Sequence, residues 1–437
     1  MKRLETDRGY SRTAFGMIAL GIATIMGIPA LAGCGIDTSG AAVAAEVDVR
    51  HFPIGNYSTD PLEFRANYHR SVIDGTQLAI ARLADSVVSG ADVDPKFDQN
   101  LRVDVLSTLG SALRVLGDPV QSALEGNGMM FGFSASVGNR PLTRLQDPDS
   151  TYNYSLFGGT IPAPGADSFS ITVLQLPDRQ RAQAASEQMA AADFGVAPDR
   201  NAHITLDRHP SAAAHWRPGV PTMAATATEG QYVVDVFTAL PTPDLGALRE
   251  LTDKVLDAEL PLLDRTPALS AREVYRLNYD PDGMLRRTLH PFDFLGIHGL
   301  DEVTHSPRGY LHLVENAGAW KPLLAANGVD RVSTAHKGAL LLRTPNAKAA
   351  TALWDGINGL PGEPVDKPEG VPDVVCARNS ARRTNSWSGF ETWYTDDTYV
   401  CNLHYDRYVA RVASDQLLDA QQRAAAQYAL LANSQWM

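Results

Sequence analysis

Ser170-Ile-Thr-Val-Leu-Gln-Leu176 and Gly338-Ala-Leu-Leu-Leu-Arg-Thr344 are the two stretches that decide the fold. Each is an apolar, strand-like run that leads into a proline and an Ala-rich helical segment, through Pro177-Asp178 in one case and Pro345-Asn346 in the other. Proline is favoured at the start of a helix because its missing N–H is not needed there. The shared order of strand, proline and helix, at an offset of 168 residues, predicts an internal duplication.

A second pair of strand-like runs supports the duplication. Tyr232-Val-Val-Asp-Val-Phe237 matches Tyr399-Val-Cys-Asn-Leu-His404 at an offset of 167, and we expect a helix after each, over residues 245–263 and 416–432. The alternative is a chance alignment of two strand–helix units. Four elements in one order at nearly one offset favour duplication.

The alignment makes a prediction that the structure can test. Under the two offsets, Cys401 corresponds to Val234 (offset 167) and Cys376 corresponds to Arg208 (offset 168). If the two cysteines pair, Val234 and Arg208 should lie on neighbouring strands.

Short strands that alternate with amphipathic helices are typical of the α+β class. We predict two duplicated modules over residues 47–266 and 267–437, each a small mixed or antiparallel sheet with helices on one face. Apolar residues at three- and four-residue steps also predict helices over 67–88 and 103–116.

The N-terminus has the pattern of an export signal. Four basic residues within the first twelve precede an uncharged run over 13–32, which ends in Leu31-Ala-Gly-Cys34. These four residues resemble the lipobox of bacterial lipoproteins. The resemblance implies that residues 1–33 are removed and that the Cys34 thiol carries a diacylglycerol, with palmitate-type chains. The alternative is an uncleaved membrane-spanning helix, because the apolar run is long enough to cross a bilayer.

Residues 34–46 are small and unpatterned, so we expect a flexible tether between the lipidated Cys34 and the first module. The expected location is the outer face of the cytoplasmic membrane, with the lipid as the membrane contact. The whole chain has a formal charge of −12, and removal of a leader with four basic and two acidic residues leaves −14. This charge argues against a nucleic-acid partner.

Two further cysteines, Cys376 and Cys401, remain after Cys34. In an exported protein two remaining thiols are expected to pair. The alternatives are a metal pair or two free thiols, but neither cysteine has the spacing of a zinc ligand.

Other residue patterns do not indicate catalysis. None of the eleven histidines has HxH, HxxxH or HExxH spacing, so we interpret them as solvent-facing rather than as metal ligands. Asn278–Gly283 resembles the first half of a calcium loop, but Leu289 stands where the loop needs a bidentate Glu, which favours a simple turn. Ser134 lies in an incomplete Gly-x-Ser-x-Gly motif. We therefore predict no catalytic residues, no metal and no cofactor.

One patch within the predicted disulfide loop is basic and aromatic, which is unusual in so acidic a chain. Arginine forks and exposed tryptophans suit anionic or sugar-bearing ligands. The alternative is a solvated loop whose tryptophans cover a small satellite core. The candidate ligand-binding residues are Arg378, Arg382, Arg383, Trp387 and Trp393.

The chain also resembles a family of uncharacterised lipoproteins from actinobacteria with mycolic-acid envelopes. The residues that carry this resemblance are Gly55-Asn-Tyr57, Asn327-Gly-Val-Asp330, Asp406-Arg-Tyr-Val-Ala410 and Ala424–Leu431. The resemblance implies an envelope lipoprotein and transfers no catalytic residue.

The sequence thus favours non-catalytic binding of an envelope lipid, glycan or protein. A solute-binding protein of a transporter is the first alternative, and it would need two doubly wound lobes joined by a hinge. An envelope hydrolase is the second alternative, and it would need a nucleophile beside an acid or base.

Overall fold

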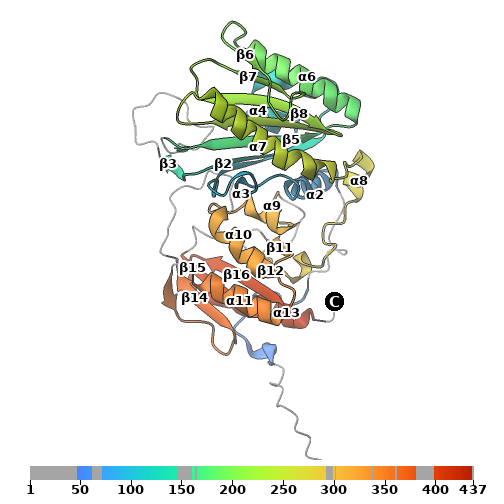
Figure 1. Cartoon of the computed structure of the whole chain (residues 1–437). Helices are drawn as coiled ribbons and strands as arrows, with labels where there is room; N and C mark the ends of the chain where they lie inside the picture. Colours follow the sequence, from blue (N-terminus) through green and yellow to red (C-terminus); the bar gives the residue numbers. More distant parts are fainter. Residues whose placement is uncertain are drawn as a thin grey trace, which may run out of the picture. The chain divides into compact units, whose positions relative to one another are not determined.

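The computed structural model describes most of the chain after the tether (Figure 1). The described residues are 47–61, 71–144, 160–162, 165–291, 299–300, 302–335, 339–359, 362–379 and 398–435. The leader, Cys34 and the tether lie outside them.

The first module contains a seven-stranded sheet in which every neighbouring pair is antiparallel. Its spatial order is β1 (Gln99–Leu106), β2 (Phe131–Gly138), β5 (Ser168–Gln175), β9 (Tyr232–Ala239), β8 (Thr222–Glu229), β7 (Ala213–Trp216) and β6 (Ala202–Ile204). A separate hairpin of β3 (Leu142–Arg144) and β4 (Thr160–Pro162) lies in sequence between β2 and β5.

The second module contains another seven-stranded antiparallel sheet. Its spatial order is β10 (Thr304–His305), β11 (Arg331–Thr334), β12 (Ala339–Arg343), β16 (Tyr408–Ser414), β15 (Tyr399–Tyr405), β14 (Val374–Arg378) and β13 (Glu363–Val365). Read from one edge to the other, the two sheets follow the same path along the chain. The predicted two-module α+β fold and its duplication are therefore confirmed.

The strand pairing corrects the second half of our alignment. Val173 of β5 lies opposite Val234 of β9, as Leu341 of β12 lies opposite Ala410 of β16. The counterpart of β9 is thus β16, and β15 corresponds to β8.

The prediction that Val234 and Arg208 lie on neighbouring strands is wrong for the same reason. Val234 pairs with Val173 and Ala227, while Arg208 lies in the bend between β6 and β7.

Helices cover both faces of each sheet, rather than one face as predicted. In β5, Val173 packs in one apolar cluster with α7, whereas the next residue, Leu174, packs in another cluster with α6. Successive residues of a strand point to opposite faces, so both faces are buried here. The helices that follow the matched strands are α6 (Arg179–Gly195), α7 (Leu245–Asp264), α11 (Ala347–Asn358) and α13 (Leu417–Asn433).

Shorter helices precede each sheet or connect its first two strands, and several of them lie between the two sheets (Figure 1). In the first module these are α2 (Val72–Ala84), α3 (Gly90–Val93), α4 (Leu109–Leu116), η2 (Asp118–Val120) and α5 (Gln121–Asn127). In the second module these are α8 (Ala271–Arg276), η4 (Leu285–Arg287), α9 (Pro307–Leu311) and α10 (Ala317–Ala326), and η1 (Val49–His51) begins the described chain.

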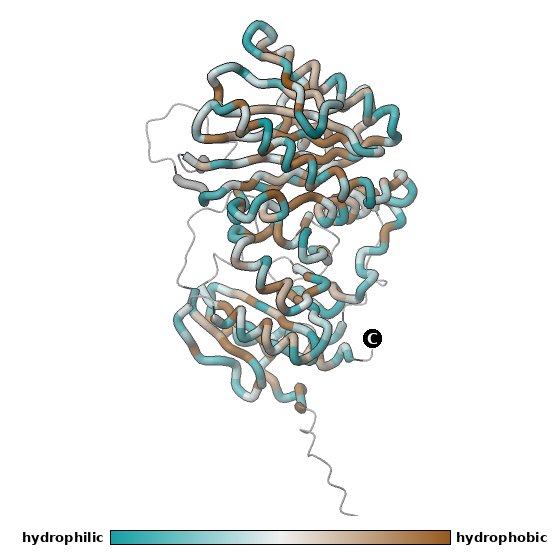
Figure 2. Tube along the Cα trace, viewed as in Figure 1, coloured by the Kyte–Doolittle hydropathy of each residue, from teal (hydrophilic) through white to brown (hydrophobic). Residues whose placement is uncertain are grey.

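Figure 2 shows apolar residues along the strands and on the helices that pack against them, with polar residues along the outer helix surfaces. The largest apolar cluster includes residues of both modules, such as Phe133 of β2 and Leu342 of β12. Within the described residues, no helix is long and apolar enough to cross a membrane.

The predicted helix over 103–116 is wrong in its first half. Residues 99–106 form the edge strand β1, and α4 begins only at Leu109, with Thr108 as its N-cap. The apolar residues keep three- and four-residue spacing across the boundary between this strand and the helix that follows it. Periodicity alone therefore does not reveal the boundary.

The same local devices recur in both modules. Asp178 caps α6 by accepting a hydrogen bond from the Arg181 N–H, and Asn346 caps α11 by accepting one from the Ala349 N–H. The preceding prolines, Pro177 and Pro345, therefore lie just outside the helices rather than in the first turn as predicted.

Candidate functional site

The segment between β14 and β15 begins and ends at a covalent link. Cys376 and Cys401 lie directly opposite each other on these strands and form a disulfide, with a Cα–Cα distance of 4.1 Å. The Asn379 N–H donates a hydrogen bond to the Thr398 carbonyl, which continues the pairing beyond the strand ends. The predicted disulfide is therefore present, at the base of the predicted ligand-binding patch.

The matched hairpin of the first module shows how unusual this segment is. There, β7 and β8 are joined by the short segment 217–221, whereas β14 and β15 are joined by 379–398. Arg378 is exposed at the base, where its Nη2 donates to the Tyr399 hydroxyl at 3.1 Å. The hydrogen bond to Tyr399 raises the pKa of Arg378, so its guanidinium stays charged. The other patch residues, Arg382, Arg383, Trp387 and Trp393, lie outside the described residues.

Several histidines are not solvent-facing, which corrects our interpretation. His305 and His312 are fully buried. His215 of β7 is half-buried, whereas its partner His203 on β6 is exposed, with the Phe194 ring stacked on it at a centroid distance of 3.9 Å. Across the described ranges, no three His, Cys, Asp or Glu side chains are placed to hold a metal ion.

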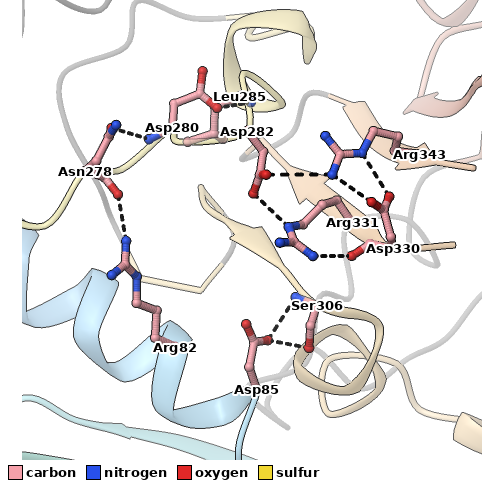
Figure 3. A network of polar contacts seen from close by, with 10 residues as sticks. All are labelled: Arg82, Asp85, Asn278, Asp280, Asp282, Leu285, Ser306, Asp330, Arg331 and Arg343. Atoms are coloured by element: carbon pink, nitrogen blue, oxygen red, sulfur yellow. Dashed lines mark hydrogen bonds and ion pairs between the residues drawn. The ribbon is translucent and has the colours of Figure 1, made fainter. Parts of the chain in front are cut away.

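A network of arginines and aspartates lies where the segment between α7 and the second sheet meets that sheet (Figure 3). We call the residues drawn there the junction network. Asp282 accepts from Arg331 Nε at 2.7 Å, and Arg343 donates to both carboxylate oxygens of Asp330 at 2.9 and 2.8 Å. The turn predicted at Asn278–Gly283 is thus present, and its second aspartate is held by the second sheet.

The first module takes part in the same network. Arg82 of α2 donates to the Asn278 carbonyl at 3.0 Å, and Asp85 accepts from both the backbone N–H and the hydroxyl of Ser306 at 2.9 Å. Gly309 permits this contact, because a Cβ there would come within 2.0 Å of the Asp85 carboxylate. The network therefore fastens the two modules to each other.

Asp330 and Arg343 of the junction network stabilise each other's charge. Burial would raise the pKa of Asp330, but the hydrogen bonds and charge of Arg343 hold it below its ordinary value. In return, Asp330 raises the pKa of Arg343. Carboxylates and guanidiniums that satisfy one another in this way hold a structure together and leave little charge for a ligand.

A second contact between the modules is buried and was missed by sequence reasoning. Val87 and Val88 share one peptide group; its N–H donates to Glu259 at 2.8 Å and its carbonyl accepts from His312 Nε2 at 3.1 Å. Glu259 belongs to α7 of the first module, and His312 follows α9 of the second. The periodicity of α7 could have shown this, since Glu259 continues its buried face after Val255 and Leu256.

Both side chains of this contact are neutral at neutral pH. Burial raises the pKa of Glu259 to about 8, and burial lowers the pKa of His312 to about 4. Among the described residues, neither Oε1 of Glu259 nor Nδ1 of His312 has a hydrogen-bond partner. We call this arrangement the buried clamp.

Ser306, His305 and Asp85 are the types of residue that a hydrolase uses, but their contacts are structural. The Ser306 hydroxyl donates to Asp85 and accepts from the Gly309 N–H as the N-cap of α9. His305 Nε2 bonds the Leu300 carbonyl at 2.8 Å. A nucleophilic serine needs its hydroxyl bonded to a base such as histidine, and here it is bonded to a carboxylate.

Comparison with protein families gives two matches. A model described as "Domain of unknown function (DUF7373) N-terminal" matches residues 66–279, and one described as "Domain of unknown function (DUF7373) C-terminal" matches residues 284–434. Together they span both modules. No curated protein and no solved structure gives a significant match to the chain.

Proposed function

The chain belongs to the DUF7373 family over both modules, and we propose that it is a lipid-anchored cell-envelope protein of a mycolic-acid-containing actinobacterium. Its proposed work is to bind an envelope lipid, glycan or protein without catalysing a reaction. The lipobox-like ending of the leader at Cys34 supports the anchor, on the outer face of the cytoplasmic membrane.

The observation that carries the binding proposal is the long segment 379–398, which stands where the duplicated hairpin has only 217–221. Long segments fixed at both ends to a rigid scaffold commonly carry binding residues. The disulfide at the base provides that fixation, and the sequence of the segment concentrates arginine and tryptophan.

The structure gives less support to the two alternatives. A solute-binding protein would need doubly wound lobes with parallel strands, and both large sheets are antiparallel. A hydrolase would need a nucleophile activated by a base, and the half-buried Ser306 has helix-capping contacts instead.

The anchor is tested by expressing the whole chain in a mycolic-acid-containing actinobacterium fed with an alkyne analogue of palmitate. We expect label on the wild-type protein, and no label with release into the medium for Cys34→Ser. Equal labelling of both proteins would contradict the anchor.

Binding is tested by native mass spectrometry of the protein purified from its own envelope. We expect a retained lipid or glycan mass, or a co-purified envelope protein. Arg382→Gln with Arg383→Gln should reduce the retained fraction at least several-fold. Arg217→Gln, in the short matched segment, is the control and should leave it unchanged. Loss in the control alone, or in neither variant, would reject the segment 379–398 as the binding element.

A further inference from the structure

The start of the described chain is fastened to the second module, although it precedes the first module in sequence. Phe52 is buried with its ring 5.7 Å from that of Tyr428 on α13. The Tyr57 hydroxyl donates to Asp419 at 2.6 Å, and Arg423 Nε donates to the same hydroxyl at 3.0 Å. Residues 48–59 therefore lie along α13. Figure 1 shows the start of the described chain, in blue, on the side of the second module away from the first.

The attachment continues to the far end of α13. The Asn433 side chain donates to the Thr59 carbonyl at 2.9 Å, and Gly55, with φ of 61°, lies against the Gln422 side chain. The buried Phe52 ring and the hydrogen bonds of Tyr57 and Thr59 hold the segment in place. The chain that follows Cys34 therefore joins the second module, at residues 48–59, before it enters the first module.

Chain length sets how far that module can stand from a lipid on Cys34. Residues 34–48 reach at most about 50 Å when fully extended, and about 20 Å as a flexible coil. A lipid at Cys34 therefore keeps the second module close to the bilayer. The first module is linked to that lipid through the second module and through the chain after residue 59.

The N-terminal end of α13 carries an exposed apolar side chain. Leu418, in its first turn, is 63% exposed and neighbours Asp419, which holds Tyr57. Thr398, at the base of the long segment, donates to Asp415 just before this helix. The contact of Tyr57, an exposed leucine and the base of the long segment therefore lie at the N-terminal end of α13.

We propose that the side of the second module that carries residues 48–59 and Leu418 faces the lipid bilayer, so that the first module is the one presented away from the membrane. The inference rests on the proposed lipid anchor and adds the orientation that the anchor imposes. It assigns the bilayer as the partner of the α13 surface beside residues 48–59, and it leaves the outer surface of the first module available to envelope partners.

The experiment attaches the chain from Cys34 to Met437 to vesicles through a maleimide lipid on Cys34, because the disulfide leaves Cys34 as its free thiol. The vesicles contain phosphatidylcholine, phosphatidylglycerol and a rhodamine-labelled headgroup. A genetically encoded fluorescent amino acid replaces either Leu418 or Val196, which are 63% and 61% exposed. Val196 follows α6 in the first module.

We expect energy transfer to the bilayer to be several-fold more efficient from position 418 than from position 196. Equal transfer, or greater transfer from position 196, would overturn the proposal. In a Phe52→Ala, Tyr57→Phe variant the segment 48–59 is released, so the difference should shrink; a difference that persists would also overturn it. Because the lipid is attached chemically, the result is independent of whether cells lipidate Cys34, which the palmitate labelling tests separately.

Discussion

The two sheets end their third strand with different chemistry, although their topology is the same. Gln175 ends β5, where its side chain donates to the Leu269 carbonyl at 2.7 Å and accepts from the Leu269 N–H at 3.0 Å. Arg343 ends β12 at the matched position, where it binds Asp330 and lies 3.7 Å from Asp282. Both residues fasten the segment that connects the modules, one with neutral hydrogen bonds and the other with charge.

The long helices α7 and α13, which follow the last strands of the two sheets, show the reverse contrast. Here the ionisable side chain is in the first module and the neutral one is in the second. Gln427 of α13 accepts from the Leu289 N–H and donates to the Arg287 carbonyl, so both ends of its amide are satisfied. Glu259 of α7 accepts from the Val88 N–H with one oxygen only. In each module a buried polar side chain fixes the backbone ahead of the first strand, and in the first module alone it can ionise.

The largest expected effect comes from exchanging the residues that end β5 and β12, Gln175 and Arg343. Gln175→Arg should destabilise the protein by about 3–5 kcal/mol, because the buried guanidinium would lie beside two uncharged groups, the Met130 sulfur and the Leu269 carbonyl. Urea unfolding followed by circular dichroism measures the loss.

Arg343→Gln is the matched control, and it should cost only about 1–2 kcal/mol, since Arg331 still holds Asp282. Equal costs for the two exchanges would mean that the environments at the two strand ends are not different.

The disulfide gives the next effect. Cys376→Ala with Cys401→Ala copies Ala214 and Ala225, the buried pair at the matched positions of β7 and β8, and should cost about 3 kcal/mol. The thermal midpoint of unfolding provides the measurement.

The reverse exchange sharpens the comparison. Ala214→Cys with Ala225→Cys should form a new disulfide in the first module, visible as a loss of two free thiols. Free thiols that persist under oxidising conditions would show that the two hairpins differ in geometry.

A pH-dependent effect should follow from Glu259→Gln, which gives α7 the amide that α13 uses. The pKa of Glu259 is about 8 in the folded protein, against an ordinary value of 4.5. Between these values the unfolded chain releases the proton and the folded protein keeps it, so the free energy of unfolding falls as pH rises. The variant should gain about 3–4 kcal/mol over wild type between pH 5 and pH 8.

Denaturant unfolding at several pH values tests this difference. His312 titrates in both proteins, with stability lost as pH falls from 6.5 towards its folded pKa of about 4, so its contribution cancels. A stability difference that does not change with pH would show that Glu259 is ionised in the folded state.

The smallest effect should be equal in the two modules. Gly128 and Gly328 follow an Asn at the ends of α5 and α10 with φ of 68° and 60°. Alanine at either position should cost about 1 kcal/mol, because an L side chain is strained in this region. Calorimetry of the two variants measures the costs, and a clearly larger loss at one glycine would show that the two turns are not equivalent.

Strand–helix units were predictable from the sequence where local signals coincide. The run before Pro177 and the run before Pro345 lie in matched strands that lead into helices. The helices predicted over 245–263 and 416–432 agree with α7 and α13 to within one residue at each end. The assignment of Tyr399–His404 to the counterpart of β9 failed because both strands of a hairpin show similar apolar patterns. Only the pairing of Leu341 with Ala410 identifies the correct partner.

The candidate site was likewise only partly predictable from the sequence. The disulfide was predictable from cysteine number and export, whereas the contrast between segments 379–398 and 217–221 required the correct strand alignment. The burial of His312 could not be predicted, because its partner Val87 lies more than two hundred residues away.

By itself, the sequence determined the α+β class, the duplication, the disulfide and the expectation of a lipid at Cys34, because each depends on local periodicity, composition or a short motif. Tertiary structure alone decided the strand register, the junction network, the buried clamp and the fastening of residues 48–59 to α13. These features depend on contacts between distant segments, and a chain's local pattern does not specify which distant segments will meet.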